Sequence, residues 1–197
     1  MTVNQPNQQQ SATVVLSTRN YNKGNTVSTN IDGYKLVIKP DPEKKNKVDI
    51  FITATEDALP LVFEQLTGFN NIKVGSKLEI ELGDQRIDDI NFEGSKSTKF
   101  TNLNISGELD IVMDSSSGDV TSIDLENSSV GEAISISTAD GDETVTLNEV
   151  KTPDLYIGVG KGEDKVSIQG GKIGRALTKG ADTREINANI ESINDDD

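Results

Sequence analysis

Apolar and polar side chains alternate in short runs along this chain, and over residues 111–193 the runs recur as one repeated pattern. In each copy, an apolar residue is followed nine positions later by Val or Ile. The copies begin at Ile111, Ile136, Ile157 and Leu177, so their offsets are 25, 21 and 20 residues. A period in the twenties is typical of a solenoid, in which each repeat forms one coil that stacks on its neighbours to bury its apolar face.

The repeat is predicted to form β-strands. Residues 133–136, 145–147 and 166–168 alternate apolar with polar side chains, which places every second side chain on one face of a strand. An earlier segment that begins at Leu78 follows the same spacing. The predicted fold is therefore all-β: over residues 78–197, a single-stranded, right-handed parallel β-helix (solenoid) of about five coils, each of about 20–25 residues.

Two positions of the coil define its predicted register. The nine-residue spacing aligns Val120, Val145, Val166 and Ile186 with one another. The residue after the second strand is polar in five successive copies, which are Glu93, Glu126, Asn148, Gln169 and Asn189. These side chains would stack at about 4.8 Å, either as a hydrogen-bonded ladder or as a row of solvated turn residues.

The first twelve residues differ from the rest of the chain, since they are polar, rich in Gln and Asn, and almost uncharged. We expect residues 1–12 to be disordered. They contain no apolar stretch of signal-peptide length. Their composition resembles the N-termini that Gram-negative bacteria export by type III secretion, so the sequence predicts a secreted bacterial protein, with a role in virulence, that needs no hydrophobic signal.

Residues 13–77 are predicted to form an N-terminal cap of strands and one short helix over residues 53–68. Thr53 and Glu56 have the spacing of a capping box, and Pro60 falls in the first turn, where proline is tolerated. An apolar helix at this place would cover the core of the first coil, which a solenoid needs at its open end.

Composition excludes several classes of protein. The chain has no Cys and no His, which rules out disulfide scaffolds, Ser-His-Asp and Cys-His catalysis, and the usual zinc sites. Aromatic residues make up 4% of the chain and Trp is absent, so a narrow core of Ile, Val, Leu and Ala is expected. No apolar run reaches the length of about 18 residues that a membrane-spanning helix requires.

The net charge of −14 is unevenly placed. Residues 1–99 carry 12 Lys and Arg against 13 Asp and Glu, whereas residues 100–197 carry 7 against 20. Such a surface repels phosphates, so nucleic acid is excluded as a partner, and divalent cations or a protein or carbohydrate surface are favoured. The charged, Pro-broken segment 39–45 contains the one basic cluster and is predicted to be a solvated turn.

Acidic residues concentrate in the turns between strands. Stacking the coils places Asp142 and Glu143 beside Glu163 and Asp164, and these carboxylates repel one another unless they are neutralised. One neutraliser is Ca²⁺, which binds carboxylate and carbonyl oxygens. The other is the pair of basic residues Lys165 and Arg184, which lie within one coil of the acids.

Residues 138–147 and 158–168 resemble the Gly/Asp-rich calcium-binding nonapeptide repeats of secreted bacterial β-rolls. That family runs its repeats in tandem, whereas here the copies are about 21 residues apart. The resemblance implies a calcium site whose ligands are Asp140, Asp142, Glu143, Glu163 and Asp164.

A second resemblance is to the small right-handed parallel β-helix pectate lyases. In that family, an acidic pair is followed about one coil later by an acidic pair with Lys, and then by an Arg that acts as the base. The matching basic positions are Lys165 and then Arg175 or Arg184. The resemblance implies calcium-dependent polysaccharide lyase chemistry, which needs no His.

The sequence thus carries two functional hypotheses. The first is a secreted β-solenoid that acts by binding, as an adhesive, scaffold or effector surface, and that calcium stabilises. The second is a calcium-dependent polysaccharide lyase on the same fold. Solenoids present long faces rather than deep pockets, so binding is favoured over catalysis.

Overall fold

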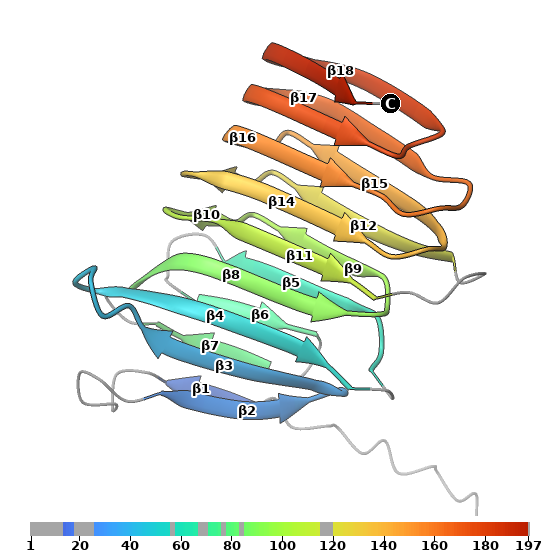
Figure 1. Ribbon diagram of the computed structural model, residues 1–197. Helices are drawn as coiled ribbons and strands as arrows, with labels where there is room; N and C mark the ends of the chain where they lie inside the picture. The colour runs from blue at the N-terminus through green and yellow to red at the C-terminus, as the bar shows by residue number, and fades with distance from the viewer. Residues whose placement is uncertain are drawn as a thin grey trace, which may run out of the picture.

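The computed structural model describes residues 14–17, 26–55, 58–66, 71–75, 78–82, 85–114 and 120–196. The protein is an all-β solenoid of about five turns, which rises from the N-terminal strands to the C-terminal strand (Figure 1). The described residues contain no helix, and hence none long and apolar enough to cross a membrane.

Each coil has three faces, and successive coils pair through parallel strands. The first face comprises β8 (Arg86–Gly94), β11 (Leu109–Met113), β14 (Ala133–Thr138) and most of β16 (Lys151–Gly158). The second face comprises β9 (Thr98–Thr101), β12 (Val120–Glu126), β15 (Asp142–Asn148) and the start of β17 (Lys165–Lys179). The third face is short and comprises β10 (Asn104–Ile105), β13 (Ser129–Val130) and the start of β16. Both β17 and β18 (Thr183–Asp196) continue around the corners from the second face to the first.

The side chains that point into the coil form one continuous apolar core. On the first face, Leu109, Ile134 and Leu155 lie in register and are fully buried. On the second face, Leu147 and Ile168 form an equivalent column. Burying one such side chain contributes about 1.5–3 kcal/mol, so these columns hold successive coils together.

The N-terminal strands extend two of the faces, and they pair with one another antiparallel except for β1, which pairs with β7 in parallel. The first face continues through β4 (Lys47–Ala54), β3 (Tyr34–Pro40) and β2 (Val27–Ile31). The second face continues through β5 (Leu61–Leu66), β6 (Asn71–Val74), β7 (Leu78–Glu81) and β1 (Val14–Ser17). The end of the solenoid is therefore closed by two sheets packed face to face, with Tyr34, Phe63, Phe92 and Phe100 clustered between them.

The helix predicted over residues 53–68 is wrong for the part of this segment that the structure describes. There, β4 runs to Ala54 and β5 begins at Leu61. Leu61 and Phe63 are buried while Val62 is 46% exposed, a period of two that fits a strand paired with β9. The rest of the predicted helix, residues 56–57 and 67–68, lies outside the described residues.

The predicted register is confirmed for the middle copies and wrong for the first. Val145 pairs with Val166, as the nine-residue spacing predicts. Val145 also pairs with Ile123, whereas Val120 pairs with Asp142 and is 77% exposed. The first copy is therefore displaced by three residues, because Ile111 and Ile123 are 12 positions apart while their partners Ile136 and Val145 are 9 apart.

The last coil departs from the prediction by one or two residues. Ile157 pairs with the buried Thr178 rather than with Leu177, and Ile186 pairs with Ile168. The polar row after the second strand consists of Glu126, Asn148, Gln169 and Asn187. Glu93 lies on the first face and Asn189 pairs with Lys172 on the third, so neither belongs to this row.

The corner after the second face repeats one backbone conformation. Asn102, Asn127, Glu149 and Gly170 all have positive φ angles, of 58°, 48°, 53° and 65°. Asn and Gly adopt this left-handed conformation at the lowest cost, which accounts for their use at three of these four corners.

Candidate functional site

The acidic turns lie on neighbouring coils, where their carboxylates accept hydrogen bonds from the backbone of the adjacent turn. Asp142 Oδ1 accepts from the N–H of Glu163 at 2.9 Å, and Asp164 Oδ1 accepts from the N–H of Glu143 at 2.9 Å. Asp140 Oδ1 accepts from the next coil in the same way, at 3.2 Å. Backbone donors therefore stabilise the negative charge of these turns and hold the coils together.

The five predicted calcium ligands do not point in one direction. Glu143 and Asp164 are each 1% exposed, whereas Asp140 and Glu163 are exposed. Glu143 accepts a hydrogen bond from Thr138 Oγ1 at 3.2 Å. Among the described residues, a group of three whose carboxylate oxygens approach within 4.8 Å occurs elsewhere, at Asp41, Asp49 and Asp88.

The three predicted catalytic residues occupy two faces of the solenoid. Lys165 and Arg184 lie at the start of the second face, next to the acidic turns, and Lys165 Nζ is 3.2 Å from Glu185 Oε1. Arg175 lies on the first face, opposite Asp154 of the preceding coil. Arg184 pairs with the buried Val166 and Lys165 pairs with Thr183, so the Lys165 and Arg184 side chains leave opposite sides of the sheet. The structure therefore does not bring the three predicted catalytic residues together.

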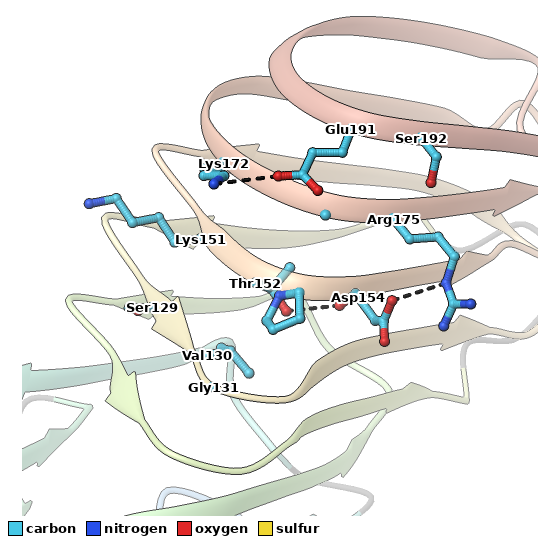
Figure 2. Close-up of a pocket in the computed structure, with 12 residues that line it drawn as sticks. Ser129, Val130, Gly131, Lys151, Thr152, Asp154, Lys172, Arg175, Glu191 and Ser192 are labelled. Carbon is cyan, nitrogen blue, oxygen red and sulfur yellow. Dashed lines mark hydrogen bonds and ion pairs between the residues drawn. The ribbon is translucent and has the colours of Figure 1, made fainter.

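Arg175 instead lies in a groove of about 1030 Å³ that crosses the last coils where the third face meets the first (Figure 2). Its lining includes Lys151, Lys172, Arg175, Asp154, Glu191 and Ser192. Lys151 and Lys172 pair in register, so their side chains leave successive coils one above the other. This places their Cα atoms about one strand spacing, roughly 4.8 Å, apart, while the Lys151 side chain extends away from Lys172 and Glu191 (Figure 2).

Glycines at the corner allow the coils beside the groove to stack closely. Gly131, Pro153 and Gly174 follow the third face in successive coils, between the lysine column and the column that contains Arg175. A Cβ atom on Gly174 would lie 2.4 Å from the carbonyl oxygen of Pro153, and one on Gly131 would lie 2.2 Å from that of Ser106. Close stacking of the coils thus requires glycine at both positions.

Arg175 is held by two neighbours. Its Nε donates to Asp154 Oδ1 at 3.0 Å, its Nη2 donates to Tyr156 Oη at 2.7 Å, and its guanidinium lies 5.8 Å from the centre of the Tyr156 ring. The hydrogen bond and the charge of Asp154 raise the pKa of Arg175 above its usual value. In the lysine column, Lys172 Nζ lies 3.4 Å from Glu191 Oε1. The groove lining therefore carries three cations, of which Arg175 and Lys172 each face a carboxylate.

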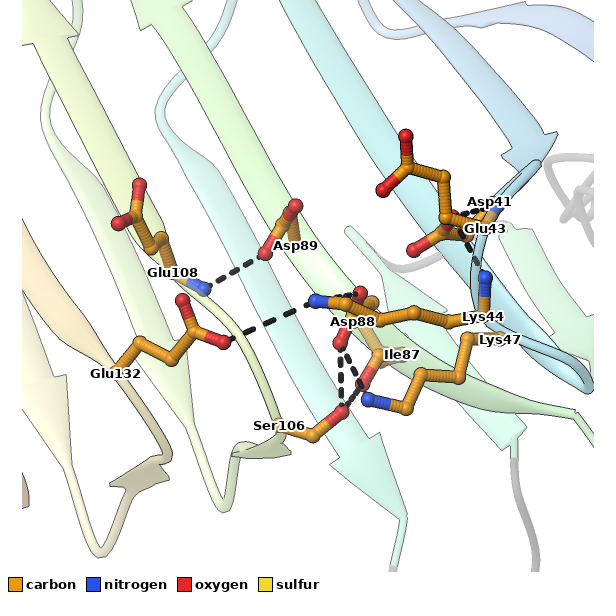
Figure 3. Close-up of polar contacts among 10 residues, drawn as sticks. All are labelled: Asp41, Glu43, Lys44, Lys47, Ile87, Asp88, Asp89, Ser106, Glu108 and Glu132. Atoms are coloured by element: carbon orange, nitrogen blue, oxygen red, sulfur yellow. Dashed lines mark hydrogen bonds and ion pairs between the residues drawn. The ribbon is translucent and has the colours of Figure 1, made fainter.

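A second polar cluster surrounds Asp88, whose side chain is fully buried (Figure 3). Lys44 Nζ lies 2.7 Å from its Oδ2, and Lys47 Nζ donates to its Oδ1 at 2.8 Å. Ser106 Oγ also donates to Oδ1, at 2.8 Å. Burial opposes ionisation of Asp88, but these three donors outweigh it and hold the pKa of Asp88 well below its usual range.

The loop that supplies the two lysines is thereby attached to the first coil. The segment predicted to be a solvated turn contains Lys44, whose hydrogen bond to Asp88 raises its pKa to about 12. Asp41 Oδ1 shapes this loop by accepting from the N–H groups of Glu43 and Lys44, at 2.6 and 3.0 Å. Lys44 and Lys47 neutralise Asp88 directly. Their ion pairs with the Asp88 carboxylate therefore hold the loop against the first coil.

The sequence-based reasoning named Arg175 but missed Lys151 and Lys172. The signal was present, because these lysines are separated by 21 residues, the same offset as the copies of the repeat that contain them. The buried role of Asp88 carried no such signal, since its two lysine partners lie more than 40 residues away in the hairpin β3–β4. No protein-family model, curated protein or solved structure matches this chain.

Proposed function

We propose that this chain is a binding protein, and that the groove on its last coils holds an extended ligand. The observation that carries this proposal is the groove itself, about 1030 Å³ in volume and lined by in-register residues of successive coils. A ligand that lies along the solenoid axis meets equivalent side chains at each coil. This is the geometry by which stacked repeats bind long partners.

Polysaccharide lyase activity is the second candidate, and the position of Arg175 in the groove is the observation that favours it. A base must lose its proton before it can accept one from the substrate. Asp154 raises the pKa of Arg175, which opposes that loss and suits the binding of an anion. Binding is therefore the better supported function.

Export from a bacterium and stabilisation by calcium belong to the same proposal. Export is supported by the composition of residues 1–12, and calcium binding by the acidic turns that contain Asp142 and Asp164. Fractionation of cultures of the source organism tests export, since the protein would be recovered from the medium.

A panel of neutral and acidic polysaccharides tests the binding function. In affinity electrophoresis, at least one polymer should retard the protein, and Ser192→Trp, which places an indole in the groove, should abolish the retardation. Ser137→Trp is the matched control, because Ser137 is exposed on β14 and does not line the groove. Equal behaviour of the two variants would contradict the proposal.

The same polymers separate binding from catalysis. Incubation with polygalacturonate and Ca²⁺ generates unsaturated products, with rising ultraviolet absorbance, only if the protein is a lyase. Absorbance that rises in the wild type and stays flat in Arg175→Lys would favour the lyase. Retardation without any rise in absorbance would leave binding alone.

A further inference from the structure

We infer that the ligand of this groove is a linear polysaccharide with an anionic group on successive sugars, lying parallel to the solenoid axis. The inference rests on the proposed function, because it names the chemical class of ligand for the same groove. The inference follows from the positions of Lys151, Lys172 and Arg175, from the spacing of the lysines along the solenoid, and from the N–H donors that these side chains can offer to a ligand.

Positive charge is scarce in this half of the chain and gathers at the groove. Residues 100–197 contain 7 Lys and Arg against 20 Asp and Glu. Three of those basic residues, Lys151, Lys172 and Arg175, line the groove. Within an acidic surface, such a cluster forms a local site for negative charge.

The carboxylates beside these cations orient them without occupying all their donors. The side chains of Lys172 and Glu191 are each 64% exposed, and that of Arg175 is 52% exposed. Ion pairs at this exposure are worth about 0–1 kcal/mol, so an incoming anion can displace or share them. Arg175 has five N–H donors, and its contacts with Asp154 and Tyr156 use its Nε and Nη2 groups.

The backbone spacing of the lysines suits a polymer with one charge per sugar. The Cα atoms of Lys151 and Lys172 lie about 4.8 Å apart, the distance between paired strands, and their flexible side chains can reach anions on successive sugars of a chain that runs along the axis. Ser129 precedes and Asn189 follows them in the same column, and both can hydrogen-bond to hydroxyl groups. The column thus places two cations between two residues that can recognise hydroxyl groups.

Nucleic acid fits this column less well. Duplex DNA carries one negative charge per about 1.7 Å of its axis, far denser than a single row of lysines at the coil spacing. Asp154 and Glu191 in the groove, and the net charge of −14, would repel the additional phosphates. A polysaccharide with sparser charge avoids that repulsion.

The test uses the full chain and compares uncharged dextran with dextran sulfate, which has the same backbone, and with alginate, a carboxylated polymer. Isothermal titration calorimetry should show binding to dextran sulfate or to alginate, and none to uncharged dextran; the two acidic polymers distinguish sulfate from carboxylate recognition, and either result supports the inference. Affinity should fall as salt is raised, because screening weakens contacts between exposed charges.

A pair of charge-matched variants locates the site. Lys151→Gln with Lys172→Gln should weaken binding roughly tenfold, which corresponds to about 1.4 kcal/mol. Lys161→Gln with Lys179→Gln removes the same charge outside the groove and should leave the affinity within about twofold of wild type. Circular dichroism verifies that both variants are folded.

The remaining outcomes distinguish the two proposals. Binding of uncharged dextran that Ser192→Trp abolishes would overturn the polyanion inference while the binding function stands. Equal weakening by both lysine pairs, or equal affinity for single-stranded DNA, would also overturn the inference. No binding to any polymer would contradict both proposals.

Discussion

Replacing Asp88 with asparagine should destabilise the fold without changing its shape. Asparagine keeps the volume of the side chain and an oxygen that can accept from Ser106 Oγ. It removes the negative charge that Lys44 Nζ and Lys47 Nζ approach at 2.7 and 2.8 Å. The loop between β3 and β4 would then be held to the first coil by weaker contacts.

The size of the effect follows from how deeply each partner is buried. Removing one partner of a fully buried ion pair costs about 3–5 kcal/mol, because a charge is left without compensation. Asp88 is fully buried, but Lys44 and Lys47 are 40% and 27% exposed and can turn toward water once released. The expected loss is therefore smaller, about 1.5–3 kcal/mol, the range for hydrogen bonds to a charged group.

Urea denaturation of wild type and Asp88→Asn at pH 7 measures this difference. Adding Lys44→Gln and Lys47→Gln to Asp88→Asn should cost little more, because the lysines have already lost their partner. A difference in unfolding free energy below about 1 kcal/mol would refute the argument, since it would mean that water replaces the network without loss.

The pH dependence of the same pair provides a second check. Because the folded pKa of Asp88 is lowered, its contribution to stability is present above the usual carboxyl pKa of 3.8 and is lost as the pH falls toward the lowered value. The advantage of wild type over Asp88→Asn should thus be constant between neutral pH and about pH 5, and should shrink below about pH 4. A gap that stays constant down to pH 2 would contradict this assignment of charge.

Further variants test other parts of the structure by thermal or chemical denaturation. Burial, followed by the charges of nearby aspartates, raises the pKa of Asp49, so Asp49→Asn should stabilise the protein by about 0.5–1 kcal/mol at pH 7, with a gain that shrinks as the pH falls and Asp49 becomes protonated. Asp164→Ala should cost about 1–3 kcal/mol, because the buried N–H of Glu143 loses its acceptor, and Asp164→Asn should cost less. Calcium binding stays a prediction: bound Ca²⁺ should raise the melting temperature by several degrees, and Asp142→Asn with Asp164→Asn should abolish the rise. A melting curve unmoved by millimolar calcium would contradict it and favour neutralisation by Lys165 and Arg184, in which case Lys165→Ala is the destabilising change. At the left-handed corner, Asn127→Ala should cost about 1 kcal/mol and Asn127→Gly almost nothing.

The strands of the coils could be predicted because apolar residues that point into the core alternate with polar residues that point outward. Val145 and Leu147 point into the core on either side of an outward Thr146, and the same order recurs at Val166 and Ile168. The false helix arose because residues 53–68 combine a capping-box spacing with an apolar run that is too short to show its period. Residues 61–66 form a strand because Leu61 and Phe63 pair with β9. No local sequence pattern signals this tertiary contact.

The register of the outer copies could not be predicted from spacing alone. Stacking requires Ile123 to meet Val145, and the additional length is taken up in the connection between β11 and β12 rather than within a strand. In the last coil, Thr178 takes the core position next to Ile157, while the more apolar Leu177 is only half-buried. Hydrophobicity therefore points to the wrong neighbour wherever a coil ends at the edge of the core.

Only part of the candidate site could be predicted from spacing along the chain. Spacing along the chain predicts which residues share a column, so the offset of 21 residues could have placed Lys172 above Lys151. It does not predict which columns face one another across a corner. That depends on where the chain turns, and the turn at Gly174 brings the lysine column beside Arg175 only because the backbone can approach Pro153 closely there. A binding surface on a solenoid is thus determined by the small residues at its corners as much as by the charged residues on its faces.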